Sequence, residues 1–183
     1  MSLARAYLAL GGNLGDRVAY LESALQMLHA NPHLEVAQVS PVYENRAVGM
    51  GPADPFLNAV AKVETTLEPL ALLELCLEVE TKLGRVRSGV WAPRTIDLDV
   101  IAYGEASIST ERLQLPHPRI RERDFVLHPL NAIAPDLRIG DSAVKDLAAA
   151  VSQEGLTKRD IVLNFALKNK ELPDRSNETK PRN

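Results

Sequence analysis

Two strand–helix–strand units joined by a hairpin predict an α+β protein with the ferredoxin-like order βαββαβ. Three observations lead to this prediction: an apolar run that ends in a glycine-rich turn, two stretches with leucines at helical spacing, and strands in which apolar residues alternate. The predicted fold is a sandwich in which the helices pack on one face of an antiparallel sheet, with additions at the C-terminus. The other face is left to an acidic pair and to loops.

The first unit begins with a buried strand at residues 4–10, which runs into a glycine-rich turn. Asp16 is placed to cap a helix after this turn. In that helix, which ends before Pro32, apolar residues recur every three or four positions. They are Val18, Leu21, Leu25 and Leu28. A strand over residues 34–43 completes the unit, and Pro41 indicates that it lies at an edge or contains a bulge.

The second unit follows a loop at residues 44–55, which is long enough to bind a ligand. A strand is predicted over residues 56–65, where Phe56 and Asn58 share one face because side chains alternate. A helix begins at Pro69, since proline is favoured at the first helical position. A loop rich in arginine connects this helix to the last strand of the unit.

That last strand carries two acids, Asp97 and Asp99. Alternation points both carboxylates to one face and sends the apolar side chains to the other, into a core. These apolar residues are Ile96, Leu98, Val100 and Ala102. The Cα atoms of the two acids lie about 6.6 Å apart, a spacing that suits two magnesium ions bound together with phosphate.

Three arginines near this strand offer the fork-shaped donors that match phosphate oxygens. They are Arg85, Arg87 and Arg94. Polyphosphate chemistry is one interpretation of the acids and arginines together, and an exposed strand whose acids simply pair with the arginines is the other. Glu80 leaves a similar choice: it lies in the last turn of a helix, where its charge opposes the helix dipole. The acid at this position either contacts a ligand or lies at a solvated helix end.

The composition is that of one globular domain, with 45% hydrophobic and 25% charged residues among 183. We expect a single domain over residues 1–167 and a disordered polar tail over residues 168–183. The net charge is −3, and the tail holds five basic and three acidic residues, which leaves −5 on residues 1–167. A body this acidic argues against nucleic acid as a partner.

No apolar run approaches the ~18 residues that span a bilayer, and no signal peptide pattern is present, so we expect a cytoplasmic protein without a membrane partner. Cys76 is the only cysteine and lies in a helical pattern, which predicts a buried thiol and excludes an internal disulfide. Further on, residues 115–127 combine two prolines, three arginines and a histidine and read alone as an exposed basic turn. Ser142 is placed to cap a third helix, and residues 160–167 form a last short strand or pack loosely.

Several segments resemble, in family order, the 6-hydroxymethyl-7,8-dihydropterin pyrophosphokinases of folate biosynthesis. The matching segments are residues 10–17 (LGGNLGDR), 56–58 (FLN), 84–87 (GRVR), 91–99 (WAPRTIDLD), 115–119 (LPHPR) and 123–127 (RDFVL). The resemblance covers about residues 4–150 and leaves the tail out. It implies transfer of the β,γ-diphosphoryl group of ATP to a pterin hydroxymethyl group, with release of AMP.

By this resemblance, Asp97 and Asp99 hold two Mg²⁺ ions, and Arg85 and Arg94 neutralise charge on the transferred group. The positions that match ATP contacts are Glu80, Arg87, Trp91, Val100, Arg112, His117 and Arg123. The positions that match pterin contacts are Val48, Phe56, Asn58 and Phe125. Phe56 and Phe125 sandwich the ring while Asn58 reads its hydrogen-bonding edge. The loop at residues 86–92 closes over the nucleotide.

Some positions depart from the family pattern. Gly12 replaces the commoner serine, and Asn45 with the two residues after it replaces Thr-x-Pro in the pterin loop. Val90 and Ala92 replace a basic residue and a glycine in the arginine loop. An active monomeric enzyme with pterin and ATP as partners is expected. The alternatives are a non-catalytic pterin or nucleotide sensor of the same fold, and an RNA-binding ferredoxin-like module.

Overall fold

The computed structural model describes residues 2–45, 54–85 and 94–165. The helices are α1 (Arg17–His29), α2 (Pro69–Lys82), α3 (Asp124–Ile133) and α4 (Val144–Ala150), with a 3₁₀ turn at Ile120–Glu122. The longer strands are β1 (Ala4–Gly12), β2 (Leu34–Val39), β3 (Val42–Asn45), β4 (Phe56–Thr65), β5 (Asp97–Tyr103) and β10 (Leu156–Arg159). Two small hairpins consist of β6 (Ile108–Ser109) with β7 (Gln114–Leu115) and β8 (Arg138–Ile139) with β9 (Ser142–Ala143).

The main sheet has the order β10-β3-β4-β1-β5, and β2 pairs with β4 beside β3. Every pairing in it is antiparallel. Strand β1 lies between β4 and β5, so both strand–helix–strand units contribute to the centre of the sheet. This arrangement confirms the predicted ferredoxin-like fold.

The single strand predicted over residues 34–43 is divided at Ser40 and Pro41 into β2 and β3. The division does not detach the chain from the sheet. The Ser40 amide donates to the Val60 carbonyl at 2.8 Å, and the Val60 amide donates to the Ser40 hydroxyl at 2.9 Å. The side chain of Ser40 therefore replaces the ladder bond that the proline interrupts.

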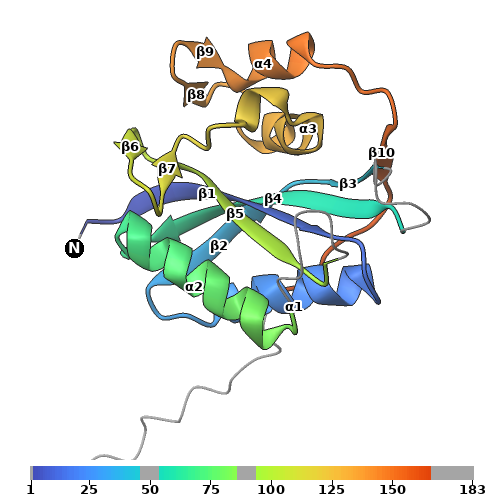
Figure 1. The fold of residues 1–183 in the computed structure, drawn as a ribbon, viewed down its shortest axis with the longest axis horizontal. Coiled ribbons are helices and arrows are strands. Elements are labelled where there is room, and N and C mark those ends of the chain that lie inside the picture. The colour runs from blue at the N-terminus through green and yellow to red at the C-terminus, as the bar shows by residue number, and fades with distance from the viewer. Residues whose placement is uncertain (1, 46–53, 86–93, 166–183) are drawn as a thin grey trace, which may run out of the picture.

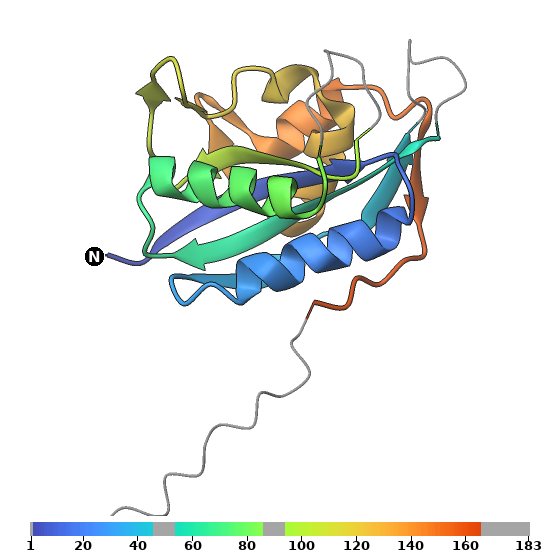
Figure 2. The ribbon, with the colours of Figure 1, turned by 60° about the horizontal axis from the view of Figure 1, so that its bottom comes forward.

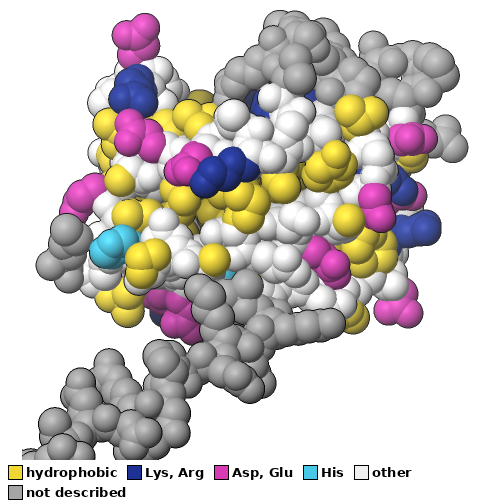
Figure 3. All heavy atoms as spheres, turned by 90° about the horizontal axis from the view of Figure 1, so that it is seen from below, with side chains coloured by type: hydrophobic (Ala, Val, Ile, Leu, Met, Phe, Trp, Pro, Cys, Tyr) yellow, Lys and Arg dark blue, Asp and Glu magenta, His cyan; other side chains and the backbone are white. Residues whose placement is uncertain are grey.

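Helices cover both faces of the sheet (Figure 1). Helices α1 and α2 lie on one face and enclose the first core, whose largest buried side chains include Leu8, Leu10, Leu25, Leu57, Leu72 and Leu98. Figure 3 shows this side of the molecule, where hydrophobic side chains remain visible among charged ones. Helices α3 and α4 lie on the opposite face over the second core, which includes Tyr7, Ala9, Val60, Ile101, Leu127 and Leu130.

The expectation that only the acidic pair and loops would lie on that second face is therefore wrong. Tyr7, Ala9 and Val60 make it apolar near the centre of the sheet, and α3 covers them. This helix was not predicted, because Pro129 lies inside it and arginines precede it. In β5, a bulge opposite Tyr7 and Leu8 places Ala102 in the second core instead of the first. Leu98 and Val100, which precede the bulge, lie in the first core as predicted.

The C-terminal elements differ from one further prediction. Ser142 does not cap α4: it lies in β9 and accepts a hydrogen bond from Arg121 at 3.3 Å, while Ala143 precedes the helix. The last described strand is β10, which pairs with β3, and residues 160–165 form no strand, in agreement with the alternative of loose packing. Residues 160–165 instead run along α1, where the Asn164 amide donates to Glu22 at 2.8 Å (Figure 2). Residues 166–183, which include the predicted tail, lie outside the described residues.

Among the described helices, none combines the length and apolar character needed to cross a bilayer.

Candidate active site

The site begins with a row of three residues across neighbouring strands. Asn58 of β4 is the register partner of Gly11 in β1, and Gly11 is in turn the partner of Asp97 in β5. The next row on the same face consists of Val60, Ala9 and Asp99. Gly11 has no side chain, and the Asn58 carboxamide oxygen lies over it, 3.1 Å from where a Cβ would be. Two strand spacings, about 9.6 Å, separate the strands of Asn58 and Asp97.

Asp97 is held by two arginines. Arg85 Nη1 pairs with its Oδ1, and Arg94 Nη1 donates to its Oδ2 at 2.6 Å. Burial alone would raise the pKa of Asp97, but the two guanidinium groups outweigh it and hold the pKa below its ordinary value. Burial likewise disfavours the charged form of Arg85, yet Asp97 and Glu80 raise its pKa. Asp97 is therefore ionised at neutral pH, as a ligand for cations must be.

Glu80 is buried, with 2% of its surface exposed, so a solvated helix end is the wrong interpretation of this residue. Its Oε1 accepts from Arg85 Nη1 and from the backbone amide of Leu98, each at 2.7 Å. The charge at the end of α2 thus fixes Arg85 and joins the helix to β5. Its position next to the acidic strand could not be derived from helical spacing alone.

Asp99 is 35% exposed at its side chain and faces the segment before α3. Arg123 Nη1 donates to its Oδ2 at 2.9 Å, and His117 Nε2 lies 4.0 Å from the same oxygen. His117 Nδ1 accepts from the Arg119 amide at 3.1 Å, so in the neutral ring the proton is on Nε2, toward Asp99. Burial, followed by Arg123, lowers the pKa of His117, although Asp99 partly opposes this. His117 is neutral at physiological pH.

Asn13 in the glycine-rich turn holds the backbone of Arg94. Its side-chain Oδ1 accepts from the Arg94 backbone amide at 2.9 Å, and its backbone N–H donates to the Arg94 carbonyl at 3.0 Å. The glycine-rich turn therefore lies next to the arginine that pairs with Asp97. Asn13 itself was missed. The signal that could have identified it is an amide side chain within a tight turn at the end of a strand.

The residues predicted to bind a pterin lie on the side of the sheet that α3 covers. Phe56 and Asn58 share a face with Val60, which belongs to the second core. Phe125 is in the first turn of α3, which packs against β4 and β3, and the Arg123 guanidinium lies 5.9 Å from the centre of its ring. Asn58 is 5% exposed, and its Nδ2 donates to Asn45 Oδ1 at 2.7 Å.

The sequence model of the 7,8-dihydro-6-hydroxymethylpterin-pyrophosphokinase family matches residues 7–135. The chain belongs to this family. A relative from Methylorubrum extorquens, named 2-amino-4-hydroxy-6-hydroxymethyldihydropteridine pyrophosphokinase, is 47% identical over 156 residues, which are 85% of this chain and 99% of the relative. The protein of the same name from Bacillus subtilis is 42% identical over 151 residues, or 82% of this chain and 87% of that protein.

Solved structures agree with the fold. A triple mutant of Plasmodium falciparum HPPK-DHPS superposes with a TM-score of 0.68 at 16% identity and covers 86% of this chain. The wild-type protein with pterin and p-hydroxybenzoate gives a TM-score of 0.67 at 17% identity. This chain spans about half the length of these two chains, at 47% and 45%.

Some residues that the resemblance predicts to contact ATP do not lie beside Asp97 and Asp99. Val100 is buried in the first core, on the face opposite to Asp97 and Asp99. Arg112 forms an exposed ion pair with Glu74 at 3.1 Å. The roles of both as nucleotide contacts stay predictions. Val48, Arg87, Val90, Trp91 and Ala92 lie outside the described residues.

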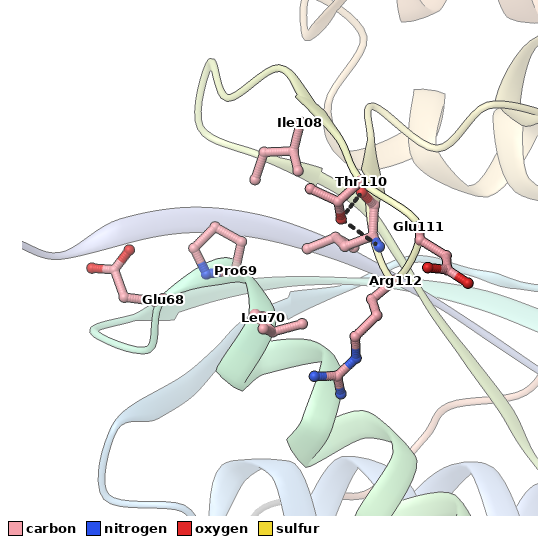
Figure 4. A pocket seen from close by; sticks show the side chains of 8 residues that line it. Glu68, Pro69, Leu70, Ile108, Thr110, Glu111 and Arg112 are labelled. Carbon is pink, nitrogen blue, oxygen red and sulfur yellow. Dashed lines mark hydrogen bonds between the residues drawn. The ribbon is translucent and has the colours of Figure 1, made fainter.

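Arg112 also borders a hollow of about 490 Å³ at the start of α2 (Figure 4). The hollow is lined by Glu68, Pro69, Leu70, Ile108, Thr110, Glu111, Arg112 and Leu113. The Tyr103 hydroxyl donates to the Leu67 carbonyl at 2.9 Å, which places this region at the far end of β5. Asp97, six residues earlier on the strand, is roughly 20 Å away. The hollow is therefore distinct from the centre formed by the acids.

The donor set at the acids fits magnesium that arrives with a nucleotide. Among the described residues, no three acidic, histidine or cysteine side chains come together to make a complete metal site. Asp97 and Asp99 offer two carboxylates on one face of a strand, next to arginines suited to phosphate. Magnesium in proteins is commonly bound by one or two carboxylates, with substrate phosphates and water completing its shell.

Proposed function

We propose that the protein transfers the β,γ-diphosphoryl group of ATP to the hydroxymethyl group of 6-hydroxymethyl-7,8-dihydropterin, with AMP as the second product. The observation that carries this proposal is the row from Asn58 through Gly11 to Asp97 in a chain of the pyrophosphokinase family. It provides an amide for one substrate and carboxylates for the metal-bound other substrate on one face, with a glycine between them.

In this reaction Asp97 and Asp99 would hold two magnesium ions, which would supply charge neutralisation of the triphosphate and a lower pKa for the attacking hydroxyl. Arg85 and Arg94 are charged, and Asp97, Glu80 and Asn13 fix their positions. Phosphoryl transfer depends mainly on positioning and electrostatic stabilisation. The two arginines thus stabilise the negative charge that develops on the transferred group.

The remaining residues orient the substrates. Phe56 and Phe125 stack on the pterin ring from β4 and α3, and Asn58 binds its polar edge, with Val48 completing this site. Neutral His117 donates from Nε2 beside Arg123 and Asp99, so it acts as a hydrogen-bond donor to the nucleotide rather than as an acid. Further nucleotide contacts are proposed for Glu80, Arg87, Trp91, Val100 and Arg112. A cytoplasmic location and a monomeric state remain predictions.

The test is AMP formation from MgATP with and without 6-hydroxymethyl-7,8-dihydropterin, for the wild-type protein, Asp97→Ala and Asp97→Asn. We expect pterin-dependent AMP from the wild type and a loss on the order of a thousandfold or more in both variants. Exposed Asp146, on α4, provides the control: Asp146→Ala should retain wild-type turnover. Wild-type turnover in Asp97→Asn would overturn the role of this carboxylate.

Asp97→Ala also removes the ionic partner of a mostly buried arginine. A relief of repulsion between Asp97 and Asp99 does not offset this, because the arginines already compensate both acids. We expect a loss of about 1 to 3 kcal/mol in the free energy of unfolding, and a smaller loss for the asparagine variant. Activity is therefore compared at a temperature where circular dichroism shows both variants to be folded.

A further inference from the structure

The buried amide of Asn58 is held by a side chain of the neighbouring strand. Asn45 ends β3, where it is the register partner of Phe56, so it lies diagonally across from Asn58 on the same face. Asn58 Nδ2 donates to Asn45 Oδ1 at 2.7 Å. The two side chains are thus linked across β3 and β4.

The link uses one of the three hydrogen-bonding positions of the Asn58 side chain. A carboxamide has an acceptor oxygen and two N–H donors. Asn45 takes one N–H, which leaves Oδ1 and the second N–H, adjacent to each other. Oδ1 lies on the Gly11 side, since a Cβ added at Gly11 would come within 3.1 Å of it. No described residue donates a hydrogen bond to this oxygen.

The two remaining positions form an acceptor next to a donor, in a fixed order. A ring edge with an N–H beside a C=O pairs with this arrangement through two parallel hydrogen bonds, and the 4-oxo edge of a pterin is such an edge. If the amide rotated by half a turn about its last side-chain bond, oxygen and nitrogen would exchange places. The same edge would then face like groups, and both bonds would be lost.

We propose that Asn45 is a positioning residue that fixes the orientation of the Asn58 amide and thereby selects an acceptor substrate with an N–H beside a C=O. This inference rests on the proposed function, because it takes a pterin as the ligand of Asn58. Asn45 acts through Asn58 and touches no reacting atom. Asn45 changes the affinity and selectivity for the pterin, and it does not change the affinity for ATP.

Two substitutions of similar size separate this role from a structural one. Asn45→Asp keeps an oxygen that can only accept, so it retains the proposed orientation, whereas Asn45→Leu removes the acceptor. We expect Asn45→Leu to raise the pterin Kd and KM about tenfold, the value of one hydrogen bond, with the KM for ATP unchanged. Asn45→Asp should stay within about threefold of wild type. A loss in Asn45→Asp equal to that in Asn45→Leu overturns the proposal, because Asn45 would then be the donor.

Selectivity supplies a readout that general loosening of β3 would not change. The probe is 2,4-diamino-6-hydroxymethylpteridine, in which an amino group replaces the oxygen and the order of donor and acceptor is reversed. Wild type should prefer the pterin, and Asn45→Leu should narrow the ratio of the two Kd values roughly tenfold, since the freed amide can turn to match either edge. An unchanged ratio in Asn45→Leu contradicts the inference.

A double-mutant cycle completes the test. In an Asn58→Leu background, Asn45→Leu should cause no further loss of pterin affinity, because its effect passes through the missing amide. An equal loss in both backgrounds overturns the proposed route. Wild-type protein that neither binds the pterin nor releases AMP would reject the proposed function itself. Wild-type turnover with an Asn45→Leu variant of normal pterin KM would reject only the role of Asn45.

Discussion

At the scale of single residues, the adjacent glycines of β1 are required for different reasons. A methyl group at Gly11 would lie 3.1 Å from Asn58 Oδ1, at the far end of a side chain that can shift slightly. A methyl group at Gly12 would lie 2.4 Å from the backbone oxygen of Thr95, which cannot move without the lead-in to β5. Gly11 therefore shapes the space for a ligand, while Gly12 permits two backbone segments to approach.

The two alanine variants should separate these roles. Gly11→Ala is expected to raise the pterin KM about tenfold through displacement of the Asn58 amide, with little change in unfolding free energy. Gly12→Ala is expected to cost about 1 to 3 kcal/mol of stability, because a packed backbone must move, and to lower kcat through the neighbouring Arg94. Steady-state kinetics and urea unfolding of both proteins measure these effects. Equal stability losses in the two variants would contradict the distinction.

Residue-level prediction from the sequence succeeded where a local pattern encodes the arrangement. Alternation placed Asp97 and Asp99 on one face, and the two acids do pair with arginines. The burial of Glu80 was not predictable in this way, since the Leu98 amide that it accepts from belongs to β5 and meets it only when α2 packs on that strand. Asn45 was noted as a departure from a family pattern, but its contact depends on the β3–β4 register.

At the scale of elements, Arg17 joins α1 to the end of β3 and to the start of β4. Arg17, in the first turn of α1, donates from Nη1 to Glu44 of β3 at 2.9 Å and to the carbonyl of Pro55, just before β4, at 2.6 Å. Arg159 of β10 lies 3.6 Å from the same Glu44 carboxylate. Because Asn45 and Phe56 directly follow Glu44 and Pro55 in the chain, Arg17 fixes the strand ends that carry two residues of the proposed pterin site.

Substitution of Arg17 should therefore change the KM for the pterin more than the KM for ATP. Arg17→Gln loses the ionic part of both contacts and is expected to raise the pterin KM several-fold, to cost on the order of 1 kcal/mol of stability, and to leave the ATP KM unchanged. The exposed Arg5–Glu64 pair on the same sheet offers the matched control. Arg5→Gln should change neither quantity appreciably. Kinetics that vary both substrates distinguish the results, and a rise in the ATP KM alone would count against this role.

Prediction at this scale was accurate for the central elements and failed toward the C-terminus. The first two helices have clear leucine spacing, and the strands beside them have apolar runs or alternation. These elements form where expected, apart from the division of the strand predicted over residues 34–43. Helix α3 has proline inside it, and β10 is a short polar strand, so neither has a local pattern strong enough to identify it. Both are stabilised by tertiary contacts, α3 by the second core and β10 by pairing with β3.

At the scale of the whole molecule, the sheet separates two cores, and residues 160–165 close the edge of the first one. Ile161, Leu163 and Phe165 pack against that core, and the Phe165 ring meets His29 edge to face at 5.9 Å. Cys76 lies in the first core with none of its surface exposed. Burial, and then the charges of Glu80 and Asp99, raise the pKa of its thiol to about 12. This matches the predicted buried thiol.

Cys76 should therefore report the opening of the first core. At pH 8 the raised pKa keeps the thiol protonated, so the thiolate fraction in the folded protein is roughly a thousandfold below that of a free cysteine. We expect labelling by a thiol reagent to be negligible in the native protein and complete in urea, with MgATP slowing the reaction at intermediate urea concentrations. Rapid labelling of the native protein would show that the core opens without unfolding.

The Asn58–Gly11–Asp97 row also fixes the distance that a substrate must span. The hydrogen-bonded spacing between β4, β1 and β5 is the same in every antiparallel sheet, so side-chain substitutions cannot adjust it. By the proposed function, an acceptor must reach from the Asn58 carboxamide on β4 to the acids on β5 that are proposed to bind the metal. A single-ring pyrimidine with the same polar edge would be recognised yet fall short of the phosphate, and would occupy the site as an inhibitor.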